Sequence, residues 1–168
     1  MKAKLIVTIF CLTFSFLGGI AQHRALTITD ADKENLSISH LDEVYLSAVH
    51  VDTSKAVFKS EAEQQQMFEA YKKLLQDFGR FLKSNNFVWD QQTTGFNRIY
   101  FDSDGSIDYF LYNFQPVKPE DQLSKEKQAE FNRLLNLFIQ DYKIPMKANR
   151  KFAQCSPTTY QPSQKKMY

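Results

Sequence analysis

Residues 96–114 read FNRIYFDSDGSIDYFLYNF. Two runs rich in aromatic and β-branched residues, Phe96–Phe101 and Ser106–Phe114, flank a short polar segment. Such runs are typical of β-strands. The segment Ser103-Asp104-Gly105 fits a three-residue hairpin loop, because a glycine readily adopts the left-handed conformation that this loop needs. The sequence therefore predicts an antiparallel hairpin centred on Asp104.

Pairing through this turn predicts which strand residues share a face of the sheet. It places Phe101 opposite Ile107, Ile99 opposite Tyr109, and Asn97 opposite Leu111. Both faces are then rich in apolar groups, so either helices cover both of them or one aromatic face binds a partner. Tyrosine and arginine are enriched at binding hot spots. The candidate ligand or partner face consists of Arg98, Tyr100, Phe110 and Tyr112; a second core layer is the alternative interpretation.

Two amphipathic helices flank the hairpin. Ser60 and Glu63 have the spacing of a capping box, and apolar residues then recur at helical spacing from Met67 to Leu82. A second apolar stripe follows Ser124 and ends before Pro145.

Shorter elements complete the prediction. Residues 87–89 are expected to begin a first strand, and residues 39–51 suit either a short helix, which we favour, or a strand. The expected fold class is α+β, a three-stranded antiparallel β-meander packed with two long amphipathic helices.

The first 21 residues resemble an export signal. A basic start at Lys2 and Lys4 precedes an apolar run, and the small residues Gly19 and Ala21 fit a cleavage site before Gln22. We therefore expect residues 1–21 to be a cleaved signal peptide and the protein to be periplasmic or extracellular. An uncleaved membrane anchor at 5–21 is the alternative, although 17 residues is short for a span.

Charge and composition divide the remaining chain. We expect a polar lead-in at 22–38, one α+β domain at 39–154, and a flexible basic tail at 155–168. Residues 142–168 carry six positive charges and no acid, whereas 22–141 carry a net charge of −6. The basic end either folds back on the acidic body or contacts an anionic envelope surface. The net charge of +2 for the whole chain argues against a nucleic-acid partner.

The chemistry-bearing residues do not form a catalytic motif. Cys155 is the one cysteine after Gln22, and the histidines His23, His40 and His50 lie far upstream of it. The segment from Asp102 to Asp108 lacks the first and last ligands of an EF-hand loop, so a turn is the better interpretation. We therefore assign no catalytic residue, metal or cofactor and expect a non-catalytic binding module of the cell envelope. The alternatives are a small hydrolase using carboxylates or Cys155, and a membrane-tethered subunit.

Overall fold

The computed structural model describes residues 23–116 and 118–162. Five strands form one mixed sheet in the order β1-β4-β3-β5-β2, and helices complete an α+β fold. In chain order the elements are β1 (Arg24–Thr27), α1 (Ile28–Lys33), α2 (Ile38–Val44), β2 (Leu46–Ser47), η1 (Thr53–Lys55), α3 (Glu61–Ser84), β3 (Thr93–Phe101), β4 (Ile107–Phe114), η2 (Pro119–Asp121), α4 (Lys125–Asp141) and β5 (Phe152–Tyr160).

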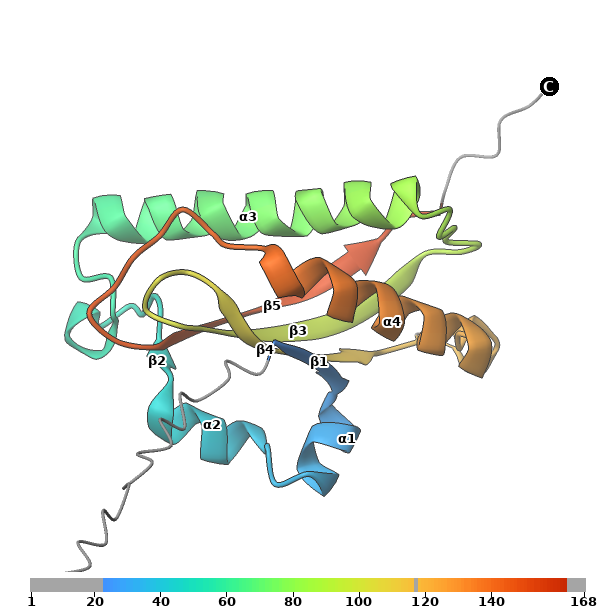
Figure 1. The fold of residues 1–168 in the computed structure, drawn as a ribbon, viewed down its shortest axis with the longest axis horizontal. Coiled ribbons are helices and arrows are strands. Elements are labelled where there is room, and N and C mark those ends of the chain that lie inside the picture. The colour runs from blue at the N-terminus through green and yellow to red at the C-terminus, as the bar shows by residue number, and fades with distance from the viewer. Residues whose placement is uncertain (1–22, 117, 163–168) are drawn as a thin grey trace, which may run out of the picture.

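Helices cover both faces of the sheet (Figure 1). The long helices α3 and α4 lie on one face, where Phe78 and Phe131 pack against Phe110 and Tyr112. The short helices α1 and α2 lie on the other, over a smaller core that includes Tyr100. None of the helices in the described part of the chain combines the length and apolar composition of a membrane span.

Both long helices are where the sequence predicts them. The side chain of Ser60 accepts a hydrogen bond from the Glu63 amide, and Glu63 bonds back to Ser60, so the capping box is present. Helix α3 ends before Asn86, which adopts a left-handed φ of 59°. Ser124 caps α4 by accepting from the Lys127 amide. Local capping chemistry and apolar spacing therefore determined these two elements.

The strand arrangement differs from the predicted meander. Strands β3 and β4 form the expected hairpin, but residues 87–89 are not a strand. Phe87 and Trp89 instead pack in the core, with the Trp89 ring stacked on Tyr160 at 4.3 Å. The third strand beside the hairpin is β5, which runs antiparallel to β3. Residues 39–51 contain all of α2 except its first residue, as favoured, and also the short strand β2.

The expected domain limits also change. The lead-in predicted at 22–38 contains β1, α1 and the start of α2, and β1 pairs in parallel with β4. The predicted flexible tail begins inside β5, which continues to Tyr160 between β3 and β2. Both β1, which is parallel to β4, and β5, which is antiparallel to β3, pair with strands that are distant in the sequence, so no local turn signal marks them. The expected signal peptide at 1–21 lies outside the described residues.

A β-bulge sets the register of the hairpin. Phe101 pairs with Ile107 as predicted, but Tyr100 pairs with Tyr109, so Asp108 is an extra residue on β4. Beyond this point Ile99 lies opposite Phe110 and Arg98 opposite Leu111, so the predicted pairs Ile99–Tyr109 and Asn97–Leu111 are wrong. One inserted residue moves every later side chain of β4 to the other face.

The tip of the hairpin is held by the loop after α4. Gly105 has a φ of +88°, as the three-residue turn requires. The Ile144 amide donates to the Gly105 carbonyl at 3.0 Å, and the Ala148 amide donates to Ser103 at 2.9 Å. A Cβ atom at Gly105 would meet the carbonyl oxygens of Ile144 and Met146. The turn is therefore packed against the chain that leads into β5.

The outer edge of β1 is protected by an amide side chain of α4. The Ala25 amide donates to Asn136 Oδ1 at 2.9 Å, and Asn136 Nδ2 donates to the Ala25 carbonyl at 3.0 Å. This geometry imitates a neighbouring strand. Exposed strand edges can pair with strands of other chains. The Asn136 side chain satisfies the hydrogen bonds of the Ala25 backbone and also prevents another strand from pairing there.

Replacing Asn136 tests this edge protection. We expect Asn136→Ala to lower the free energy of unfolding by about 1–3 kcal/mol, because both Ala25 backbone groups lose their partner. Urea unfolding followed by circular dichroism measures the change. Gln76→Ala, an exposed amide on α3, is the control and should change stability by less than about 0.5 kcal/mol. Equal effects of the two substitutions would contradict the role of Asn136.

Candidate functional site

The four residues of the predicted partner face do not share one face. Phe110 and Tyr112 belong to the core under α3 and α4, whereas Tyr100 belongs to the core over α1 and α2. The bulge at Asp108 is the reason, since it shifts β4 by one residue relative to the predicted pairing. Tyr100 and Phe110 have no exposed surface, and Tyr112 is 1% exposed. The predicted common surface is therefore wrong, and these side chains act as core.

Arg98 and Tyr100 do remain neighbours, but they hold α2 rather than face solvent. Arg98 donates to Asp42 Oδ1 from Nε at 3.0 Å and from its terminal nitrogen at 2.5 Å. The Tyr100 hydroxyl donates to the same oxygen at 3.2 Å. Burial alone would lower the pKa of Arg98, but the Asp42 contacts outweigh burial and raise it. This ion pair fastens α2 to the sheet.

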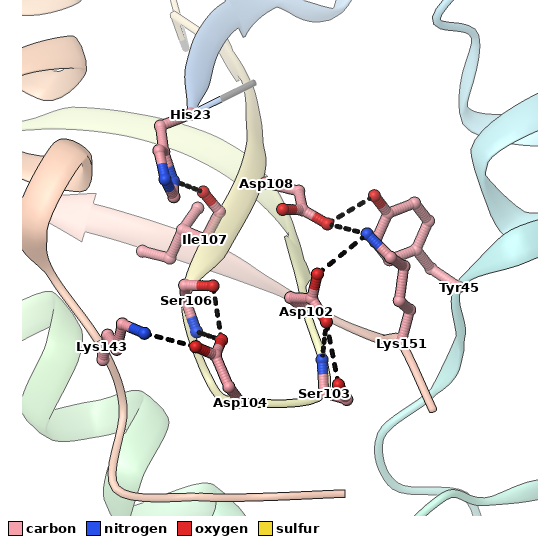
Figure 2. Close-up of polar contacts among 10 residues, drawn as sticks. All are labelled: His23, Tyr45, Asp102, Ser103, Asp104, Ser106, Ile107, Asp108, Lys143 and Lys151. Carbon is pink, nitrogen blue, oxygen red and sulfur yellow. Dashed lines mark hydrogen bonds and ion pairs between the residues drawn. The ribbon is translucent and has the colours of Figure 1, made fainter. Parts of the chain in front are cut away.

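A second polar cluster surrounds the bulge; we call Tyr45, Asp102, Asp108 and Lys151 the Asp108 cluster (Figure 2). Asp108 is 2% exposed, and its Oδ2 accepts from the Tyr45 hydroxyl at 2.8 Å and from Lys151 Nζ at 2.6 Å. Lys151 Nζ also lies 3.1 Å from Asp102 Oδ2. The cluster thus joins the hairpin to the end of α2 and to the residue preceding β5.

The protonation states of the Asp108 cluster suit a structural role. Burial, followed by the hydrogen bond to Asp108, raises the pKa of Tyr45. Burial acts to lower the pKa of Lys151, but hydrogen bonds to Asp108 and Asp102 outweigh it and raise that pKa. At neutral pH Lys151 is therefore an ammonium and Tyr45 a neutral phenol. Neither group is a general base or an activated nucleophile.

The hairpin carboxylates are paired with lysines. Asp104 bonds to Lys143 and to Ser106, and these contacts hold the pKa of Asp104 well below its usual range. Burial acts to raise the pKa of Asp102, but bonds from Ser103 and Lys151 lower it overall. Within the described residues, no group of three or more His, Cys, Asp or Glu side chains has metal-binding geometry. Two lysines of the basic end thus fold back on the acidic body.

Cys155 and the histidines are dispersed. Cys155 is a partly buried free thiol on β5, opposite Arg98 in the β3 pairing. His23 bonds to the Ile107 carbonyl at 2.7 Å, His40 lies on α2 within 3.9 Å of Glu43, and His50 bonds within its own loop. None of these contacts joins an imidazole to the thiol, which is the pairing that nucleophilic catalysis needs.

Two pockets lie at opposite ends of β3. The basic pocket has a volume of about 350 Å³ and lies beside β2. Leu46 of β2 pairs with Phe152 of β5, and Phe152 pairs with Phe101 at the end of β3. It is lined by Leu46, Ser54, Lys55, Ala56, Val57, Lys59, Asn149 and Arg150. The polar pocket, about 370 Å³, lies beside the start of β3 and is lined largely by threonine, asparagine, glutamine and aspartate side chains.

Sequence reasoning missed the Asp108 cluster and both pockets. Asp108 is the one charged residue in the run Ile107–Phe114, and a lone carboxylate inside an apolar strand is a signal for a bulge or a buried ion pair. Its partners lie on distant segments, and the sequence carries no sign of them. The pockets likewise combine loops that only the tertiary fold brings together.

A double-mutant cycle tests the Asp108–Lys151 pair. We expect Lys151→Met to lower the free energy of unfolding by about 2 kcal/mol, because the buried Asp108 carboxylate loses its counter-charge. The effect is smaller than for a fully buried pair because the Lys151 side chain is 38% exposed, and solvent screens its charge. Asp108→Asn should cost less in the Lys151→Met background than in the original chain. Lys147→Met, at an exposed lysine, is the control. If the changes in unfolding free energy caused by Lys151→Met and Asp108→Asn are strictly additive in the double variant, the two side chains are not directly coupled.

The same contacts predict a pH profile. The raised pKa of Lys151 gives stabilisation that is present below about pH 10.4 and lost as the pH rises through the folded pKa. The lowered pKa of Asp102 gives stabilisation that is present above about pH 3.9 and lost as the pH falls through the folded pKa. The free energy of unfolding, measured between pH 3 and 11, should have a plateau at intermediate pH, and this plateau should be lower in Lys151→Met. Equal loss at every pH would contradict this assignment.

No family model, curated protein or solved structure matches this chain. Its functional interpretation therefore rests on its own geometry. The relevant features are charged groups that pair with one another inside the protein, and two pockets of different chemistry at the two ends of β3.

Proposed function

We propose that the protein is an exported, non-catalytic binding module of the cell envelope that contacts anionic lipid headgroups through its basic pocket. The observation that carries this proposal is the composition of the pocket wall. Three cationic side chains, Lys55, Lys59 and Arg150, line it, and no acidic residue does. Such clusters attract anionic groups because their fields add.

The distribution of ion pairs supports this choice of surface. Of the basic residues after Asp141, Lys143 and Lys151 pair with acids of the hairpin. Arg150 has no ion pair or hydrogen bond among the described residues and lines the pocket. The Lys59 ammonium donates to the Ser54 carbonyl, and the Lys55 ammonium makes an exposed pair with Asp52 at 3.7 Å. These charges remain available to an outside anion.

Apolar surface accompanies the charges. Leu46, Ala56 and Val57 line the same pocket, and Leu46 is exposed. Val51, in the loop before η1, is fully exposed. Basic groups beside exposed aliphatic groups are typical of surfaces that sit at the headgroup level of a membrane, where both the charge and the apolar contact contribute to binding.

Vesicle binding tests the proposal with the chain from Gln22 onward. We expect it to sediment with vesicles of phosphatidylcholine and phosphatidylglycerol, and far less with phosphatidylcholine alone. Lys55→Gln/Lys59→Gln/Arg150→Gln should weaken binding by about 100-fold, since each basic side chain near such a surface contributes about 1 kcal/mol. Added salt should weaken binding as well.

The matched control removes three exposed charges elsewhere. Lys72→Gln/Lys83→Gln/Lys125→Gln has the same net charge as the pocket variant, and its positions lie on α3 and α4. If both variants lose affinity equally, net charge rather than the basic pocket drives binding. Absence of binding to the anionic vesicles would overturn the proposed partner.

Export has its own test. In the native host, the intact mass of the protein should correspond to a chain that begins at Gln22, because Gly19 and Ala21 fit the cleavage site. A mass that retains residues 1–21 in the membrane fraction would instead support the tethered alternative.

A further inference from the structure

The polar pocket lies where β4 continues past the end of β1. Strand β1 pairs with β4 only as far as Thr27 and Tyr112, and the chain then turns into α1. Beside the following residues of β4, Asn113 and Phe114, a cavity of about 370 Å³ opens. The β1–α1 junction, the start of β3 and the segment that leads into α4 form its other walls. Volumes of this order are typical of small-molecule sites.

The chemistry of the wall favours an uncharged ligand. Eight neutral side chains with hydrogen-bonding groups line the pocket, and no basic residue does. Of the two carboxylates, Asp30 is already bonded to Lys33 and Thr27. An anion would therefore find no counter-charge here. The neutral groups are Thr27, Thr29, Gln92, Thr93, Thr94, Asn113, Gln122 and Gln128.

Asn113 supplies the most specific sign of a ligand. Its Oδ1 is buried and has no hydrogen-bond partner among the described residues. Buried polar atoms are nearly always paired, and leaving one unpaired costs about 1–3 kcal/mol. An amide carries both donors and an acceptor, and a half-turn exchanges them. Since Asn113 lines the pocket, a rotation of its side chain that brings this oxygen to the pocket would pair it with a donor on a bound molecule.

Apolar groups complete the wall. Phe114, Pro116 and Leu123 line the same cavity. Sites for small ligands combine apolar surface with a few polar groups that fix orientation. A ring that has hydroxyls around its rim and C–H groups on its face matches this arrangement, because the hydroxyls meet the amides while the C–H face lies against Phe114.

We propose that the polar pocket binds a neutral saccharide of one or two rings. Asn113 and Gln122 bond to its hydroxyls, and Phe114 packs against the ring. The site is separate from the basic pocket, because Thr94 lies near the start of β3 and the basic pocket lies near its other end. Saccharide binding and membrane contact can therefore succeed or fail independently.

Ligand-observed NMR and calorimetry test the site with the chain from Gln22 onward. The probes are glucose, N-acetylglucosamine, maltose and trehalose, each up to 20 mM in concentration, with glucose 6-phosphate as the charged comparison. We expect at least one neutral probe to bind, and glucose 6-phosphate to bind more weakly than glucose. Failure of all four neutral probes, or preference for the phosphate, overturns the proposal.

Two variants connect binding to the pocket. Asn113→Leu and Gln122→Ala should each weaken binding of the neutral probe by about tenfold, and Gln76→Ala on α3 should leave it unchanged. Gln122 is exposed, so its substitution keeps the test valid even if Asn113→Leu unfolds the protein. Unchanged affinity in Gln122→Ala and in a folded Asn113→Leu places the ligand elsewhere and overturns the proposal. The Lys55→Gln/Lys59→Gln/Arg150→Gln variant should bind the saccharide normally.

Discussion

The β-bulge at Asp108 is the constraint on which the rest of the structure depends. One extra residue on β4 puts Phe110 and Tyr112 under the long helices and keeps Tyr100 beneath the short ones. The Asp108 carboxylate lies on the α1–α2 side, where Tyr45 and Lys151 bond to it. A buried carboxylate is tolerated only when it is paired in this way. Register, core composition and the anchoring of β5 thus follow from one residue.

Most charged groups that could have suggested chemistry are used internally. Arg98 with Asp42, Lys151 with Asp108, and Lys143 with Asp104 each join segments that are distant in the sequence. The basic end of the chain therefore serves first as a set of counter-charges for the acidic hairpin. Arg150, which makes no ion pair among the described residues, lines the basic pocket, and the proposed membrane contact is placed there for that reason.

The fold could be predicted from the sequence where local rules suffice. The two long helices follow from capping residues and apolar spacing, and the hairpin follows from its turn. The candidate face could not be predicted, because strict alternation fails at a bulge. Arg98, Tyr100, Phe110 and Tyr112 were chosen for their residue types, and residue type does not distinguish a core aromatic from a binding aromatic.

The sequence by itself determined α3, α4 and the Asp102–Ser106 turn, since each depends on residues within a few positions of one another. Only the tertiary structure decided that β1 and β5 belong to the sheet, that Asn136 covers the edge of β1, and that two pockets open at the ends of β3. These features join segments up to 111 residues apart. Such contacts form because distant groups satisfy one another's hydrogen bonds and charges, and no local pattern records that match.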